Sequence, residues 1–392
     1  MITNISVDGF KSLQNFELSF TPGLNILVGP NGSGKTNIVS FFEFVTHLMQ
    51  VDASEATSRV GGAGAVFRRV GDGYDKNIVS KVTGCVAAPE PHLIPKKRST
   101  RFKYIQYDYS FTLLFPETRD TVVFQRQRLQ LRGVKNFICQ TATDTPFEQW
   151  GIDIEMNLSP EGATSIKIHS FDLSKVGIVF YSFGSTKAKN EFENMLANVA
   201  SPNASIINIL ARFSPGLWSM INDISTGQIY NIIPSRIKIP EDSAKSPGIA
   251  RDGSGLAATL YAIQKNKSVD HFNTWNYFGA VAPNFRHISM ASLQSYLTLV
   301  NSSIESIHVE NDTFDNQLKV RFEVRSGAYS AIVPMSLMSD GTLKWVALVT
   351  AALTATSLFS CLQLVNESVI KSAKPIFFKF FILTNVKLKV SK

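Results

Sequence analysis

The fold of this chain is decided by the stretch Gly29-Pro30-Asn31-Gly32-Ser33-Gly34-Lys35-Thr36, which matches the pattern G-x-x-x-x-G-K-[ST]. The apolar run 24–28 comes directly before it and is typical of a short strand. Residues 37–49 follow and are apolar on most faces of a helix, which predicts a helix buried against a sheet. Strand, glycine-rich loop and helix in this order form a P-loop, so we expect the chain to bind a nucleoside triphosphate.

The chemistry of phosphate binding explains the spacing of this motif. Glycines at 29, 32 and 34 leave room for a concave backbone turn, and the N–H groups of residues 31–36 can point at phosphate oxygens. The positive end of the following helix favours an anion, Lys35 can reach the β- and γ-phosphates, and the Thr36 hydroxyl can ligate Mg²⁺. The predicted cofactors are therefore ATP and Mg²⁺. The predicted nucleotide-binding residues in this stretch are Gly29, Pro30, Asn31, Gly32, Ser33, Gly34, Lys35, Thr36 and Asn37.

Composition indicates a folded protein with a mild preference for polyanionic partners. The 392 residues are 44% hydrophobic and 18% charged, which allows a packed core and argues against global disorder. The net charge is +8, a modest excess for this length. The three cysteines lie far apart, and the N-terminus has no basic segment followed by an apolar block. We therefore expect a cytoplasmic protein without structural zinc; the six histidines have no metal-ligand spacing.

One uncharged stretch, 345–365, is long enough to span a bilayer. Six Ser, Thr and Gln residues interrupt it, at positions 350, 354, 356, 357, 360 and 363. We interpret it as a buried helix, a turn and a buried strand, and expect no membrane association.

Hydrophobic periodicity predicts an α/β chain. Strands are expected at 77–84, 103–115, 120–132 and 176–183, a hairpin at 304–310 with 317–324, and a short strand at 330–335. Residues 186–221 and 256–265 have helical periodicity, with Asp252 or Ser254 as a cap for the second helix. The glycine-rich segment 51–76 is expected to be a loop.

Basic residues gather at 96–98 and continue at Arg101, Lys103, Arg126, Arg128, Arg132 and Lys135. Two interpretations are open. The cations could form a phosphate-backbone surface for nucleic acid, or they could be a solvated loop and the polar face of a strand. No aromatic pattern accompanies them to specify nucleic acid.

A second constellation lies far downstream, at Ser339-Asp340-Gly341-Thr342-Leu343. It opens a predicted helix that runs to about residue 353, with Ser339 as its N-cap. Gly341 would let a phosphate approach the backbone at the positive helix end. Ordinary helices also begin in this way. The functional interpretation is favoured by the position of the motif, far downstream of the P-loop and behind an antiparallel strand region.

The segments 2–13 and 27–37 together resemble the head of the RecF/SMC/OLD-type ABC ATPases. The stretch Asp252-Gly253-Ser254-Gly255-Leu256-Ala257-Ala258 resembles a mid-chain block of that group, and Met338-Ser339-Asp340-Gly341-Thr342-Leu343-Lys344 resembles its signature motif. The resemblance implies a head-to-tail homodimer with ATP between the P-loop of one subunit and Ser339 to Gly341 of the other. It also implies DNA repair, chromosome maintenance or phage defence, DNA as a partner, and in defence members an effector nuclease. Lys11 lies where the family often places a basic residue near the nucleotide.

The chain departs from this family after the signature helix. The family has a strand ending in Asp/Glu-Glu there, and the matching residues are Asn366 and Glu367. Glu367 is therefore the predicted catalytic base, and Lys35 is the other predicted catalytic residue. Asn366 is a neutral ligand and would hold Mg²⁺ less tightly. No histidine follows His308, and the tail from 371 has six lysines and no acid. The family also has a glutamine that senses Mg²⁺. No single residue of this chain matches it, and Gln50 and Gln106 are both candidates. Either the chain is a degenerate ATPase, or its reading frame shifts or stops near 358–366.

The sequence thus predicts an α/β P-loop NTPase: an ABC-ATPase-like head with a mixed sheet and a helical insertion. The expected parts are 1–175 as the N-terminal lobe, 176–285 as a mainly helical insertion, 286–367 as the C-terminal lobe and 368–392 as an atypical tail. The first function is an ATP-binding, ATP-hydrolysing, DNA-associated enzyme of a repair or phage-defence type. The alternatives are an ATP-gated sensor or scaffold with little turnover, which recruits an effector, or an inactive truncated fragment.

Overall fold

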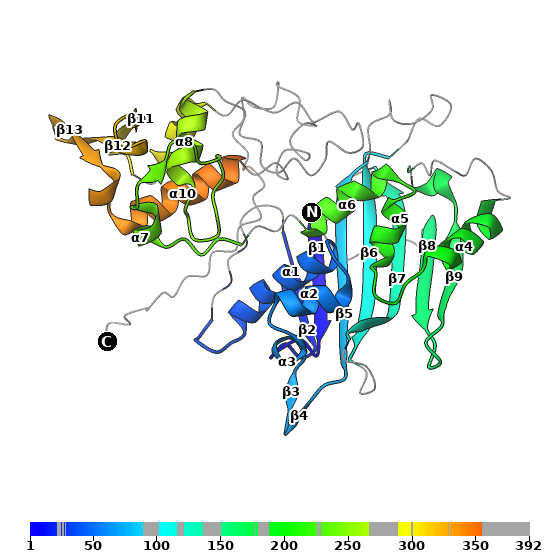
Figure 1. Ribbon diagram of the computed structural model, residues 1–392. Helices are drawn as coiled ribbons and strands as arrows, with labels where there is room; N and C mark the ends of the chain where they lie inside the picture. Colours follow the sequence, from blue (N-terminus) through cyan, green and yellow to red (C-terminus); the bar gives the residue numbers. More distant parts are fainter. Residues whose placement is uncertain are drawn as a thin grey trace, which may run out of the picture. The chain divides into compact units, whose positions relative to one another are not determined.

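The computed structural model describes most of the first 354 residues (Figure 1). The described residues are 1–21, 25, 27, 29–88, 102–115, 121–135, 150–176, 178, 188–225, 229–265, 289–298, 301–327 and 329–354. They belong to two compact units, whose boundary falls between Gly227 and Gln228. The predicted boundaries at 175, 285 and 367 stay predictions, and the predicted tail 368–392 lies outside the described residues.

The first unit is built on a seven-stranded antiparallel sheet with the order β2-β1-β5-β6-β7-β8-β9. Its strands are β1 (Ile2–Asp8), β2 (Phe16–Ser19), β5 (Asn77–Ala87), β6 (Tyr104–Leu114), β7 (Val123–Val134), β8 (Ile152–Leu158) and β9 (Thr164–Phe171). A small hairpin, β3 (Arg69–Val70) and β4 (Gly73–Tyr74), lies beside it. Together with the helices described below, this sheet confirms the α/β class. The predicted strands before the P-loop, at 176–183 and at the end of the stretch 345–365 lie wholly or mostly outside the described residues.

Helices cover one face of this sheet (Figure 1). They are α1 (Lys35–Leu48), α2 (Ala53–Arg59), α3 (Ala63–Val66), α4 (Ala188–Val199), α5 (Ile206–Ala211) and α6 (Trp218–Ser225), with short 3₁₀ turns at Leu173–Lys175 and Pro215–Leu217. The core beneath α1 is aromatic: the Phe10 ring lies 5.4 Å from the Phe41 ring and 5.5 Å from the Phe44 ring, centroid to centroid. All three side chains are fully buried, so α1 is fixed firmly to the turn that follows β1.

The second unit contains an antiparallel sheet of β11 (Ile304–Asp312), β12 (Gln317–Ser326) and β13 (Tyr329–Pro334), with the short β10 (Glu241–Asp242) also paired to β12. Its helices are α7 (Pro234–Ile237), α8 (Leu256–Gln264), α9 (Met290–Leu297) and α10 (Asp340–Thr354), and a 3₁₀ turn spans Met335–Leu337. The apolar faces of α8, α9 and α10 share one hydrophobic core with β11 and β12.

Several predicted elements differ from the structure. The segment 51–76 is not a plain loop, because it holds α2, α3 and the β3–β4 hairpin. Strands β8 and β9 had no counterpart in the prediction. The predicted cap of α8 is also wrong: its N-cap is Gly255, and the buried carboxylate of Glu241 accepts hydrogen bonds from the backbone N–H groups of Gly255 and Ala258.

Among the described residues, no helix is long and apolar enough to cross a membrane. The uncharged stretch that begins at 345 is helical up to Thr354, within α10, and its later part lies outside the described residues.

Candidate nucleotide-binding site

The P-loop ends in a backbone turn that only glycine adopts easily. Gly32 has φ 86° and Gly34 has φ 85°, both in the left-handed region. Gly34 is the N-cap of α1 and has no side chain that could cap the helix. The first N–H groups of a 14-residue helix therefore face the loop without a side-chain acceptor at the cap position. Such a helix start attracts an anion.

Lys35 folds back over this loop. Its Nζ donates hydrogen bonds to the carbonyl oxygens of Gly29 and Pro30, each at 2.6 Å, and to Ser33 Oγ at 3.3 Å. The ammonium group thus lies where the loop carbonyls converge. The Thr36 side chain, one residue further on, is exposed.

The turn after β1 supports the P-loop from one side. Asn37 Nδ2 donates a hydrogen bond to Ser12 Oγ at 2.6 Å. A Cβ atom on Gly34 would lie 3.5 Å from both Ser12 Oγ and Leu13 Cδ2, so the two segments are in contact. Sequence reasoning did not single out Ser12. Its signal is its place in the same 2–13 segment whose resemblance to ATPase heads is noted above.

Lys11 belongs to this turn as well. Its backbone N–H donates to the Val66 carbonyl at 2.9 Å, and its Nζ lies 5.6 Å from the centroid of the Phe10 ring. The role of Lys11 as a phosphate contact stays a prediction.

A family model described as an AAA domain matches residues 4–63, which contain most of β1, the turn with Ser12, the P-loop, α1 and α2. Part of the chain is also similar to RecF proteins. The chain is 34% identical over 68 residues to the DNA replication and repair protein RecF of Corynebacterium jeikeium. Residues 4–63 are thus similar to an AAA domain, and part of the chain is similar to RecF proteins. The predicted resemblance is thereby confirmed for this region.

The extent of these matches limits what the AAA domain alone implies. The Corynebacterium match covers 17% of this chain and 14% of that relative. The RecF of Erwinia tasmaniensis is 39% identical over 46 residues, which is 12% of this chain and 13% of the relative. Activity, substrates and partners of the whole protein are therefore matters for proposal.

Two solved structures align with more of the chain at low scores. The SMC head bound to the C-winged helix domain of ScpA aligns with 91% of this chain and 77% of its own, at 14% identity and a TM-score of 0.31. The recombination mediator protein RecF with ATP aligns with 95% of this chain and 81% of its own, at 10% identity and a TM-score of 0.22. Such distant alignments assign no residue of this chain a role.

The second predicted site lies in the second unit. Ser339 Oγ accepts a hydrogen bond from the Thr342 backbone N–H at 3.2 Å, and the two hydroxyl groups lie 2.8 Å apart. The predicted N-cap role of Ser339 thus agrees with the geometry of α10. Gly341 has open space where a side chain would be, with no described atom within 4 Å of a Cβ placed there.

The structure leaves two of the remaining predicted residues untested and describes two others. Glu367 and Asn366 lie outside the described residues, so the roles given to them stay predictions. Gln106 is buried and accepts a hydrogen bond from Arg132 Nε at 2.8 Å, whereas Gln50 is exposed just beyond the end of α1.

Two cations of the predicted basic surface, Arg126 and Arg128 on strand β7, are paired with acids on β8. Arg128 makes a two-pronged ion pair with Asp153, at 2.9 and 2.8 Å, and Arg126 Nε lies 3.0 Å from Glu155 Oε1. Arg132, besides its hydrogen bond to Gln106, lies over the Trp150 ring. Of the two interpretations, these contacts favour the polar strand face. The cluster at 96–98 lies outside the described residues.

Proposed function

We propose that this chain binds MgATP through its P-loop and works as a DNA-associated ATPase of the RecF kind. The observation that carries the proposal is the loop that ends at Gly34, with left-handed glycines, an uncapped helix start and Lys35 folded over it. Phosphate oxygens would replace the Gly29 and Pro30 carbonyls as acceptors for Lys35, because an anionic acceptor makes the stronger charge-assisted hydrogen bond. The exposed Thr36 hydroxyl would join the Mg²⁺ shell.

We propose further that ATP joins two copies of the chain head to tail. The P-loop of one copy would face Ser339 and Gly341 of the other. The open space at Gly341 supports this arrangement. A glycine in the first turn of a helix costs stability relative to alanine, and no described neighbour requires it here. A phosphate that approaches from a second copy would require it.

DNA association rests on the relatives, which are named DNA replication and repair proteins. The modest excess of positive charge is compatible with it. Glu367 would act as the base that polarises the attacking water. We also propose a phage-defence role and an effector nuclease as partner, and both rest on the family resemblance alone.

A second candidate function is favoured by Asn366. An amide in place of a carboxylate weakens the Mg²⁺ shell, so turnover would be slow while binding persists. The chain would then act as an ATP-gated sensor or scaffold that dimerises and leaves the effector step to a partner.

Hydrolysis and dimerisation measured side by side separate these functions. For an ATPase, we expect steady-state turnover that falls at least about 100-fold in both Lys35→Ala and Glu367→Gln. For a sensor, we expect dimerisation on ATP with no turnover above background. A chain that neither turns over nor dimerises would contradict both proposals and support the inactive fragment. Lys167→Ala, an exposed lysine on β9, is the matched control and should leave both readouts unchanged.

A further inference from the structure

An ion pair connects the signature stretch, Ser339 to Gly341, to a part of the second unit that is distant in sequence. Lys238 Nζ donates a hydrogen bond to Asp340 Oδ1 at 2.8 Å. Asp340 is the first residue of α10 and stands between Ser339 and Gly341. The Lys238 side chain is 29% exposed and that of Asp340 is 68% exposed, so the pair lies at the surface with the lysine as its more enclosed member.

Lys238 is held in place by the short helix α7. Pro234 begins this helix with its φ already suited to it, and the Lys238 N–H donates to the Pro234 carbonyl at 3.0 Å. α7 also contacts α10. The backbone of Lys238 is therefore fixed at the end of α7, which limits the positions that its side chain can reach.

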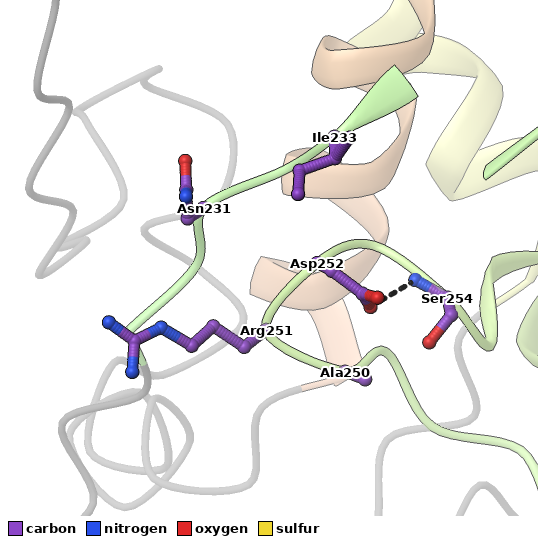
Figure 2. A pocket seen from close by; sticks show the side chains of 6 residues that line it. All are labelled: Asn231, Ile233, Ala250, Arg251, Asp252 and Ser254. Atoms are coloured by element: carbon purple, nitrogen blue, oxygen red, sulfur yellow. Dashed lines mark hydrogen bonds between the residues drawn. The ribbon is translucent and has the colours of Figure 1, made fainter. Parts of the chain in front are cut away.

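The mid-chain block at 252–255 braces α7 in turn. The Ile233 N–H donates to the Asp252 carbonyl at 2.9 Å, and Asp252 Oδ1 accepts from the Ser254 N–H at 3.0 Å. Ile233, Asp252 and Ser254 are among the residues that line a hollow of about 440 Å³. Figure 2 shows the Asp252 carboxylate turned back to Ser254. A Cβ on Gly253 would lie 2.9 Å from Ile237 Cγ1, so the block packs directly on α7.

Charge explains why this chain of contacts matters. An acid in the first turn stabilises a helix through the helix dipole, which accounts for Asp340 as a structural residue. The same carboxylate repels a triphosphate that approaches Ser339 and Gly341. A cation bound to it removes most of that repulsion without removing the acid.

We propose that Lys238 is a positioning residue of the signature stretch: it holds and neutralises Asp340, so that the triphosphate bound by a second copy can reach Ser339 and Gly341. This inference rests on the ATP-joined dimer proposed above. It gives the mid-chain block a role, because the block supports the helix from which Lys238 extends.

The test compares dimerisation driven by a slowly hydrolysed ATP analogue, measured by sedimentation, with binding of the same analogue to the single chain. For Lys238→Ala, we expect dimerisation about five- to tenfold weaker, with unchanged affinity for the analogue before dimerisation. Lys238→Arg should match the wild type, because it keeps a cation on Asp340.

A second change removes the repulsion itself. Asp340→Asn in the Lys238→Ala background should restore dimerisation to within about twofold of the wild type. About 0.5 M salt should narrow the deficit of Lys238→Ala, since screening weakens repulsion between surface charges. A purely structural role would lower the melting temperature and would not depend on salt in this way. Lys319→Ala, which also removes a lysine from an aspartate, Asp312, is the matched control and should dimerise normally.

Two results would overturn the inference. Wild-type dimerisation on the analogue, with Lys238→Ala indistinguishable from it or not rescued by Asp340→Asn, would remove the role of Lys238 and leave the proposed dimer standing. No dimerisation of the wild type would remove both.

Discussion

At the scale of single residues, the site depends on Lys35 and on the glycine before it. Lys35 makes its present hydrogen bonds to carbonyl oxygens of its own loop, which are weaker acceptors than phosphate. The left-handed conformation of Gly34 points the start of α1 at the same place. The ammonium group and the start of the helix therefore both lie at the loop where we propose that a phosphate binds.

Gly9 is the residue that fixes the supporting turn. It has φ 82°, and a Cβ placed there would lie 2.3 Å from the Asn77 carbonyl oxygen on β5. We expect Gly9→Ala to lower the free energy of unfolding by about 2–4 kcal/mol, from backbone strain and this clash together. It should also weaken nucleotide binding, because the displaced turn carries Ser12, which holds Asn37.

Gly71→Ala is the control for this prediction, and chemical denaturation is the measurement. Gly71 has φ 57° with no described atom within 4 Å of an added Cβ, so strain alone should cost about 1 kcal/mol. Equal costs at the two glycines would show that the contact with Asn77 does not matter.

At the scale of elements, the neighbouring strands β7 and β8 share a ladder of paired charges. Glu155 on β8 receives hydrogen bonds or ion pairs from Arg126, Asn157 and His169. Partial burial raises the pKa of Glu155, but the hydrogen bonds from Asn157 and His169 and the charge of Arg126 outweigh it and lower the pKa to about 2. The polar face of the sheet is therefore held by its own ion pairs.

A pH dependence follows from this shift. The folded pKa of about 2 lies below the ordinary value of 4.5, so the contribution of Glu155 to stability is complete above pH 4.5 and is lost as the pH falls toward 2. Denaturant titrations should find Glu155→Gln less stable than the wild type at neutral pH, with the difference shrinking by about pH 3. A difference that stays constant across this range would contradict the assignment.

The elements also show what sequence patterns could predict. The strands β5, β6 and β7 and the helix α1 were predicted to within a few residues, because their apolar periodicity is local. β8 was missed although Ile152, Ile154 and Met156 alternate with polar residues, which is the pattern of a half-buried strand, so a local signal was present in the sequence. α2 had a signal as well: Asp52 accepts a hydrogen bond from the Glu55 N–H at 2.8 Å, a cap that the spacing of the two acids marks.

At the scale of the whole molecule, the two predicted halves of the nucleotide site belong to different units. The turn at Gly32 and Gly34 and the helix that follows it could be predicted, since eight consecutive residues specify them. The cap of α8 could not, because Glu241 lies 14 residues before Gly255 and meets it only through the tertiary fold. The Lys238–Asp340 pair spans 102 residues and is beyond any local pattern for the same reason.

Equilibrium binding of a fluorescent ATP analogue, with and without Mg²⁺, tests the P-loop account most directly. The account predicts saturable, Mg²⁺-dependent binding by the wild type, a loss of at least about tenfold in affinity for Lys35→Ala, and no change for Lys167→Ala. Lys35→Ala binding as tightly as the wild type, or a wild type with no Mg²⁺-dependent affinity, would contradict it.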